Sequence, residues 1–147
     1  MYWENYTVGD EFLSSGRTVT DADIRLFIGA TNATHPAHLD AEYAKSHPFG
    51  RIAAQGSLLI GIVDGFAVVC TGALQSNVMH YGYDKIRFLK PVFVGDTVRL
   101  QGSVGEVRER GEEFGLVYFD YKILNQDDEL VCVMRDIAMF EREKKYD

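Results

Sequence analysis

The chain has 147 residues, near the usual size of one folding unit, so we expect a single domain over residues 1–147. It carries 22 acidic and 15 basic side chains, a formal net charge of −7, which argues against nucleic-acid binding through a basic surface. A few local cations could still hold an anionic small molecule. The sequence has neither a membrane-helix pattern nor a secretory signal pattern. We therefore expect a cytoplasmic protein that does not enter a membrane.

The first third of the chain predicts a strand and two short helices. Residues 12–19 have the character of a short strand, and Thr20 then suits the N-cap of a helix over 21–30. Asp40 can cap a further short helix that runs through Lys45. The segment between the two helices is expected to be irregular.

The segment from Gly56 to about Cys70 predicts the most apolar helix of the chain. Its apolar residues fall on nearly all sides of a helical wheel, a pattern typical of a helix that is buried all round. Other elements should therefore wrap around it.

The second half of the chain has the composition of strands. Short turns separate the segments, and consecutive strands with short turns indicate an antiparallel meander. One buried helix with a long antiparallel sheet curled around it is an α+β architecture. Such a sheet has edges that pairing of two copies could protect. The predicted strands cover residues 79–89, 97–108, 113–124 and 130–142.

Two stretches resemble the MaoC-like dehydratases and R-specific enoyl-CoA hydratases. The first runs from Phe27 to Gly56 and the second from Tyr83 to Thr97, in the order expected of that family. Together they comprise 45 of the 147 residues and span residues 27–97. Positions that match the family pattern are Pro36, His38, Asp40, Ala44, Phe49, Ile52, Ala53 and Gly56, followed by Arg87-Phe88, Lys90-Pro91 and Gly95-Asp96.

The resemblance implies a hot-dog fold, in which a long antiparallel sheet wraps one central helix, and a site shared across a homodimer or higher homo-oligomer. It implies a hydro-lyase that adds or removes water across the α,β double bond of an enoyl-CoA. No cofactor is expected, since coenzyme A is the carrier part of the substrate. Residues 80–85 also look like the branch that handles branched or carboxylated thioesters, such as mesaconyl-CoA hydratases.

Three positions depart from the family pattern. The family's catalytic aspartate falls on Ala33 and its asparagine on His35, while the position before Gly56, often histidine, is Gln55. The aspartate–histidine pair of the family is thus incomplete in this chain.

His38 and Gly56 are the leading candidates for chemistry. Histidine can both take and give a proton near neutral pH, so we assign His38 as general base and acid. The Gly56 N–H, at the start of a helix, could stabilise the thioester oxygen as it becomes an enolate. The simpler alternatives are a loop histidine bonded to backbone and a glycine that merely permits close approach.

The role left by Ala33 has several candidates. The Asn32 amide can hold a water molecule but cannot take its proton. Alternatively, His35 replaces the carboxylate, His38 works alone, or a carboxylate arrives from elsewhere in the fold, Asp84 first. Gln55 itself is expected to be structural or part of a pocket wall.

Other polar residues allow both functional and structural interpretations. Four cations could contact coenzyme A phosphates or simply be solvated: Arg51, Lys85, Arg87 and Lys90. A metal site at His35 and His38 is not expected, because no third ligand lies nearby. Tyr81 and Tyr83 are expected in the core or an interface, and Cys70 and Cys132 in packing.

Two other functions remain open at this point. The chain could be a non-catalytic, acyl-CoA-binding subunit of a heteromer, in which Ala33 is a real loss. A thioester hydrolase would need an acidic residue on the central helix, where Asp64 is the candidate, about two turns inside it.

Overall fold

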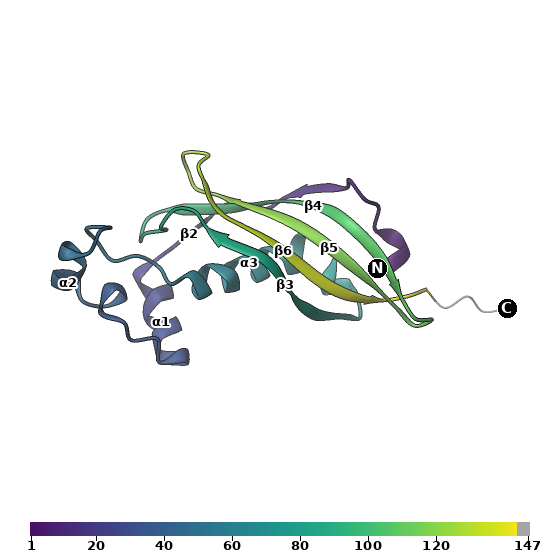
Figure 1. Ribbon diagram of the computed structural model, residues 1–147, viewed down its shortest axis with the longest axis horizontal. Helices are drawn as coiled ribbons and strands as arrows, with labels where there is room; N and C mark the ends of the chain where they lie inside the picture. Colours follow the sequence, from purple (N-terminus) through teal and green to yellow (C-terminus); the bar gives the residue numbers. More distant parts are fainter. Residues whose placement is uncertain (144–147) are drawn as a thin grey trace.

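An antiparallel sheet packed on one long helix forms the two layers of the computed structural model, which describes residues 1–143 (Figure 1). The strand order is β1-β4-β5-β6-β3, and β2 pairs with β4 off this path. Figure 1 shows α1 and α2 gathered at the end of the molecule where α3 begins. The α+β class and the sheet-on-helix architecture expected from the sequence are confirmed.

The elements follow one another along the chain with short connections. The helices are α1 (Asp21–Thr31), α2 (Ala41–Ser46) and α3 (Gly56–Cys70), with 3-10 turns η1 (Trp3–Asn5), η2 (Pro36–His38) and η3 (Ala73–Gln75). The strands are β1 (Glu11–Leu13), β2 (Arg17–Thr18), β3 (Val78–Phe88), β4 (Thr97–Arg110), β5 (Phe114–Leu124) and β6 (Leu130–Glu141).

The predicted meander is present in β4, β5 and β6, which pair in sequence order through two hairpins. β3 does not extend it next to β4 but pairs with the far side of β6. The end of β3 at Phe88 is thereby brought to the N-terminus of α3, where a Cβ added at Gly56 would meet the Phe88 ring.

The single strand predicted over residues 12–19 is wrong, because the segment divides into β1 and β2. Ser14 explains the interruption: its N–H donates to the Leu100 carbonyl at 2.9 Å, and its hydroxyl accepts from the Leu100 N–H at 2.8 Å. A side-chain oxygen thus takes the place of a ladder carbonyl, and regular pairing stops there.

α3 begins and ends where the sequence predicts, but it is not enclosed on all sides. Leu58, Leu59, Ile62, Val63 and Ala67 are buried against the sheet, where they contribute to the main core. The opposite side is exposed: Val68 keeps 41% and Val69 68% of its surface. The prediction that α3 is buried on all sides is therefore wrong for a single copy of the chain, because the sheet covers only one side of the helix.

The caps predicted for the two smaller helices are confirmed. Thr20 accepts a hydrogen bond from the Asp23 N–H, and Asp23 bonds back to the Thr20 N–H, which completes a capping box. Asp40 accepts from the Glu42 and Tyr43 N–H groups at the start of α2. The Asp40 cap lies two residues after His38, at the end of the segment that carries it, whereas the Thr20 cap begins the helix before that segment.

Within residues 1–143, no helix is both long and apolar enough to cross a membrane. The single domain over residues 1–147 stays a prediction, and residues 144–147 lie outside the described part of the chain.

Candidate functional site

His38 is held by the backbone of the segment that leads into α3. It lies at the end of η2, and its Nδ1 is 2.7 Å from the Ala53 carbonyl oxygen. A carbonyl can only accept, so Nδ1 carries the proton in this contact. In the neutral ring the lone pair is then on Nε2, the nitrogen that can act as a base.

His38 and Gly56 line the same cavity, which has a volume of about 330 Å³. A cavity of this size, largely apolar with a few polar groups, is typical of a small-molecule site. Its other lining residues are Phe49, Ala53, Ala54, Gln55, Leu59, Phe88, Leu89, Lys90, Pro91 and Val92. The structure thus brings together the two residues that the sequence singled out most strongly.

Gly56 opens α3 without a side-chain cap, since its N-cap residue Gln55 makes no capping hydrogen bond. The first N–H groups of a helix have no partner within it and carry the positive end of the helix dipole. A Cβ at position 56 would lie 2.7 Å from Cζ of Phe88. Close packing by Phe88 therefore explains why this residue is glycine, while its N–H remains suited to an oxyanion.

The Gln55 side chain is buried without a hydrogen-bond partner. The residue keeps 5% of its surface, and neither its Nε2 nor its Oε1 meets a partner among the described residues. Buried amides are normally paired. The sequence predicted a pocket wall or structural role, and the cavity lining confirms the wall. Nothing in the sequence indicated that the amide would be unpaired.

Asn32 does not line the cavity, so its predicted water-holding role gains no support from this placement. It is the exposed C-cap of α1, in the left-handed region with φ of 57°. Asparagine tolerates this conformation well, which gives the residue a structural explanation.

His35 lies near His38 but does not line the cavity. The two ring centroids are 6.1 Å apart, and Nδ1 of His35 accepts the Ala37 N–H at 3.2 Å as the cap of η2. The ring nitrogen that an orienting carboxylate would contact on His38 is already bonded to Ala53. A backbone carbonyl, rather than an acid, therefore orients His38.

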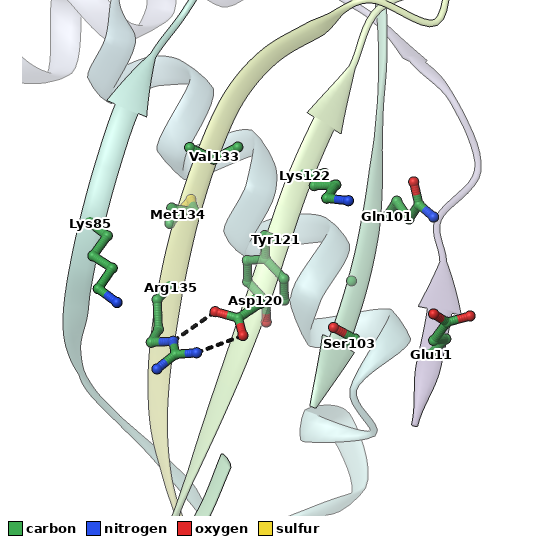
Figure 2. Close-up of a pocket in the computed structure, with 11 residues that line it drawn as sticks. Glu11, Lys85, Gln101, Ser103, Asp120, Tyr121, Lys122, Val133, Met134 and Arg135 are labelled. Atoms are coloured by element: carbon green, nitrogen blue, oxygen red, sulfur yellow. Dashed lines mark hydrogen bonds and ion pairs between the residues drawn. The ribbon is translucent and has the colours of Figure 1, made fainter. Parts of the chain in front are cut away.

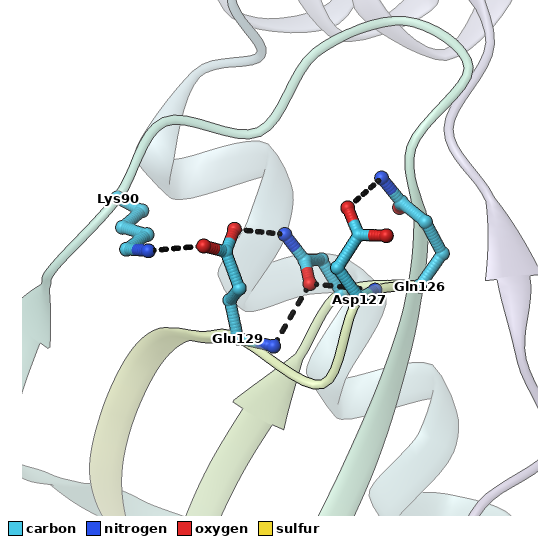
Figure 3. Close-up of polar contacts among 5 residues, drawn as sticks. Lys90, Gln126, Asp127 and Glu129 are labelled. Carbon is cyan, nitrogen blue, oxygen red and sulfur yellow. Dashed lines mark hydrogen bonds and ion pairs between the residues drawn. The ribbon is translucent and has the colours of Figure 1, made fainter.

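Of the four candidate cations, Lys90 lines the His38 cavity. Its ammonium is 2.5 Å from Oε1 of Glu129, which belongs to the turn between β5 and β6 (Figure 3). Asn125 donates to the other oxygen of Glu129 and accepts the Glu129 N–H, so the carboxylate is fixed in place. The Lys90 hydrogen bond is the main cause that lowers the pKa of Glu129.

The other three cations lie elsewhere. Lys85 lines a groove of about 280 Å³ on the sheet face turned away from α3, beside the Arg135–Asp120 ion pair (Figure 2). Arg51 stacks over the Phe93 ring at 3.8 Å and lines a different pocket. Arg87 is exposed and donates to the Ile86 carbonyl. Their predicted contacts with coenzyme A phosphates gain no support from this arrangement.

Neither candidate carboxylate lines the cavity. Asp84 is exposed on β3, opposite Arg135 of β6. Asp64, eight residues after Gly56, is about 12 Å further along the helix at ~1.5 Å per residue, and it accepts a hydrogen bond from the Tyr83 hydroxyl. Burial and the Asp64 carboxylate raise the pKa of Tyr83, which suits a structural donor, as expected for this tyrosine.

Burial also raises the pKa of both thiols, that of Cys132 to about 11. Neither is activated as a thiolate near neutral pH, which fits their expected packing role. In residues 1–143, no group of three or more histidine, cysteine or acidic side chains is arranged to hold a metal ion.

Comparison with known proteins identifies the fold. A monoamine oxidase regulatory protein from Archaeoglobus superposes with a TM-score of 0.90 at 32% identity, covering 98% of this chain and 96% of that one. A Mycobacterium tuberculosis protein described as a double hotdog fold gives a TM-score of 0.85 at 18% identity and covers 100% of this chain and 46% of its own. The hot-dog fold implied by the sequence motifs is confirmed.

Curated relatives include two hydratases. An (R)-specific enoyl-CoA hydratase from Rhodospirillum rubrum is 32% identical over 100 residues, which are 66% of this chain and 65% of that enzyme. A mesaconyl-CoA hydratase from Cereibacter sphaeroides is 29% identical over 132 residues, which are 88% of this chain and 38% of the relative. The matches thus span less than two-thirds of each relative's own length.

The family model for the MaoC-like domain matches residues 4–121. That range includes the η2 histidine, the start of α3 and the whole of β3. The chain therefore belongs to the MaoC-like domain family.

Proposed function

We propose that this chain is a hydro-lyase that adds water to, or removes it from, the α,β double bond of an enoyl-CoA thioester. The observation that carries the proposal is the His38–Ala53 hydrogen bond, because it leaves Nε2 of His38 as the basic nitrogen in the cavity that also contains the Gly56 end of α3. The names of the two hydratase relatives support the same reaction class.

In the hydration direction, His38 Nε2 takes a proton from a water molecule as the water oxygen attacks C3 of the substrate. The electron pair of the double bond moves towards the thioester, whose oxygen becomes an enolate. The Gly56 N–H donates to that oxygen, with the helix dipole behind it. The protonated His38 then gives its proton to C2, so one histidine serves both steps.

The absence of a carboxylate at Ala33 changes how the base is supported. In the aspartate–histidine arrangement of the family, an acid assists the histidine. Here the Ala53 carbonyl fixes the ring and its tautomer. We therefore assign both proton transfers to His38 alone, which was one of the alternatives that the sequence left open.

Coenzyme A enters the proposal as part of the substrate, and no resident cofactor is invoked. Lys90, at the cavity, is the candidate for a phosphate or pantetheine contact. The ion pair with Glu129 holds the Lys90 ammonium beside the cavity. Because exposed ion pairs are weak, the ammonium remains free to exchange Glu129 for a substrate group.

The test compares His38→Gln with the matched control His35→Gln in a hydration assay using crotonyl-CoA and mesaconyl-CoA. Glutamine cannot accept a proton, so we expect kcat of His38→Gln to fall by about 10²–10⁴-fold. His35→Gln removes a histidine of the same loop and should stay within about threefold of wild type. Activity of His38→Gln equal to that of the control would end the assignment.

A second candidate is a non-catalytic acyl-CoA-binding subunit, favoured by Ala33. It predicts that the wild-type chain binds crotonyl-CoA in calorimetry but does not turn it over by itself. A thioesterase is disfavoured, because Asp64 lies outside the cavity and is hydrogen-bonded to Tyr83.

A further inference from the structure

Gln55 lines the cavity, and its buried side chain leaves its own hydrogen-bonding capacity unsatisfied among the described residues. Both ends of the carboxamide are buried and lack partners within residues 1–143, although the residue keeps 5% of its surface. Leaving a buried amide unpaired destabilises a fold, whereas an apolar residue of the same shape would not. Packing alone therefore does not explain a glutamine at this position.

Its position in the chain links it to both proposed site residues. The Ala53 carbonyl orients His38, and Gly56 begins a 15-residue helix whose N-cap is Gln55. Ala53, Gln55 and Gly56 all line the cavity. One four-residue segment thus holds the base, presents the helix N-terminus and carries the unpaired amide.

We propose that the Gln55 carboxamide binds the oxygen on C3 of the substrate: the attacking water in hydration, or the 3-hydroxyl of a 3-hydroxyacyl-CoA in dehydration. This inference rests on the proposed function and assigns the recognition of its reacting oxygen. The amide can accept the O–H through Oε1 or donate to the oxygen through Nε2, but it cannot take the proton. Gln55 therefore orients the oxygen, and His38 transfers the proton.

Substrate geometry supports the C3 oxygen as the partner. C3 is two carbon–carbon bonds from the thioester carbon, so its oxygen must lie close to the group that binds the thioester oxygen. Gln55 directly precedes Gly56, and consecutive Cα atoms are about 3.8 Å apart. The polar side chains that line the cavity are His38, Gln55 and Lys90, while Leu59, Phe88 and Val92 provide apolar walls.

The reaction balances with these groups alone. In hydration, the O–C3 bond forms, the C2–C3 π bond breaks, one water proton moves to His38 Nε2, and that proton moves on to C2. In dehydration the same steps run in reverse and release water. Gln55 exchanges no proton or electron in either direction.

The experiment uses Gln55→Met, which keeps the unbranched shape and removes the amide, with Gln75→Met at an exposed position as the matched control. Calorimetry compares (R)-3-hydroxybutanoyl-CoA with butanoyl-CoA, which lacks the 3-hydroxyl. We expect wild type and Gln75→Met to bind the hydroxy compound at least tenfold more tightly. Gln55→Met should bind the two with equal affinity.

Two further readouts separate binding from structure. The thermal midpoint of Gln55→Met should equal or exceed that of wild type, because a buried unpaired amide is replaced by an apolar group. In the crotonyl-CoA assay, kcat of this variant should fall about 100-fold, with KM within threefold of wild type.

The outcomes distinguish this inference from the proposed reaction. Equal weakening of both ligands in Gln55→Met, or an unchanged preference for the hydroxy compound, overturns the Gln55 assignment and leaves the hydratase intact. A wild type that shows the preference without turnover overturns the hydratase and retains the Gln55 assignment. A wild type that binds neither compound overturns both.

Discussion

Asp136 is a buried carboxyl group whose protonation should affect stability. It keeps 6% of its surface, accepts a hydrogen bond from the Tyr121 hydroxyl at 3.2 Å, and has Nε2 of His80 3.0 Å from its Oδ1. Burial is the main cause that raises its pKa; Asp64 adds to this, and His80 and Tyr121 oppose it.

The sign of the pH effect follows from that direction. In the folded chain Asp136 keeps its proton to a higher pH than in the unfolded chain, so ionising it costs free energy of folding. The contribution is absent below the unfolded pKa, near 3.9, and grows as pH rises through the raised folded pKa. Asp136→Asn imitates the protonated acid and lacks this cost.

We therefore expect the free energy of unfolding of Asp136→Asn, relative to wild type, to decrease as pH is lowered from about 7.5 to 4.5. Urea denaturation of both proteins at several pH values measures the difference. A difference that grows on acidification would contradict the raised pKa. Asp120→Asn, at the half-exposed partner of Arg135, serves as a carboxyl control on the same sheet.

At the scale of single residues, the sequence identified His38 and Gly56 but not the state of their neighbours. Residue type and spacing indicate that a histidine and a helix-starting glycine are present. They do not indicate which atom orients the ring, because the Ala53 carbonyl is 15 residues away along the chain. The unpaired state of Gln55 is likewise a property of packing, not of residue type.

At the scale of elements, the start of α1 is the clearest case of a helix end specified by neighbouring residues. The Thr20 hydroxyl accepts the Asp23 N–H at 3.2 Å, and Asp23 accepts the Thr20 N–H at 2.8 Å. Both residues lie within one turn, so the contact depends on local sequence alone. That is why the start of this helix could be predicted.

Thr20→Ala should lower the free energy of unfolding by about 0.5–2 kcal/mol, since an N-terminal N–H loses its acceptor. Thr31→Ala is the control at the other end of α1, where the hydroxyl bonds the Phe27 carbonyl, which is part of the helix itself. Urea midpoints measure both variants. Equal losses would mean that the cap adds nothing beyond a generic threonine contact.

The strands show where local prediction fails. Alternation and turns identified β4, β5 and β6, whose neighbours are adjacent in the sequence. The division of residues 12–19 into β1 and β2 depends on Ser14 meeting Leu100, 86 residues away. The pairing of β3 with β6 is also non-local, so neither could be read from a short window.

At the scale of the whole molecule, we propose that two copies associate over the exposed side of α3 and the β3 edge. The family resemblance implied a homodimer or higher homo-oligomer without naming this surface. Gly61, Gly65 and Val68 lie on one exposed side of the helix at i, i+4 and i+7. Met79 and Tyr81 are exposed on β3, which ends the sheet order. Exposed apolar residues that continue onto a sheet edge are typical of an interface.

Val68→Asp should therefore convert a dimer of about twice 16.6 kDa to a monomer, because a desolvated charge would face the partner. Val8→Asp introduces the same charge at an exposed valine outside this surface and should leave the mass unchanged. Sedimentation velocity measures both. If both variants remain dimeric, the interface lies elsewhere. If the wild type is a monomer, the proposal is wrong.

Local sequence patterns were enough to predict most of the elements and the family. α3 from Gly56 to Cys70, the caps at Thr20 and Asp40, the meander and the MaoC-like motifs all depend on residues that are close together in the chain or recur at a fixed period. Tertiary structure alone decided that β3 joins β6, that one side of α3 stays exposed, and that His38 is oriented by Ala53 while Gln55 is left unpaired. The physical reason is that hydrogen-bond partners and burial are set by segments meeting in space, which local residue patterns do not encode.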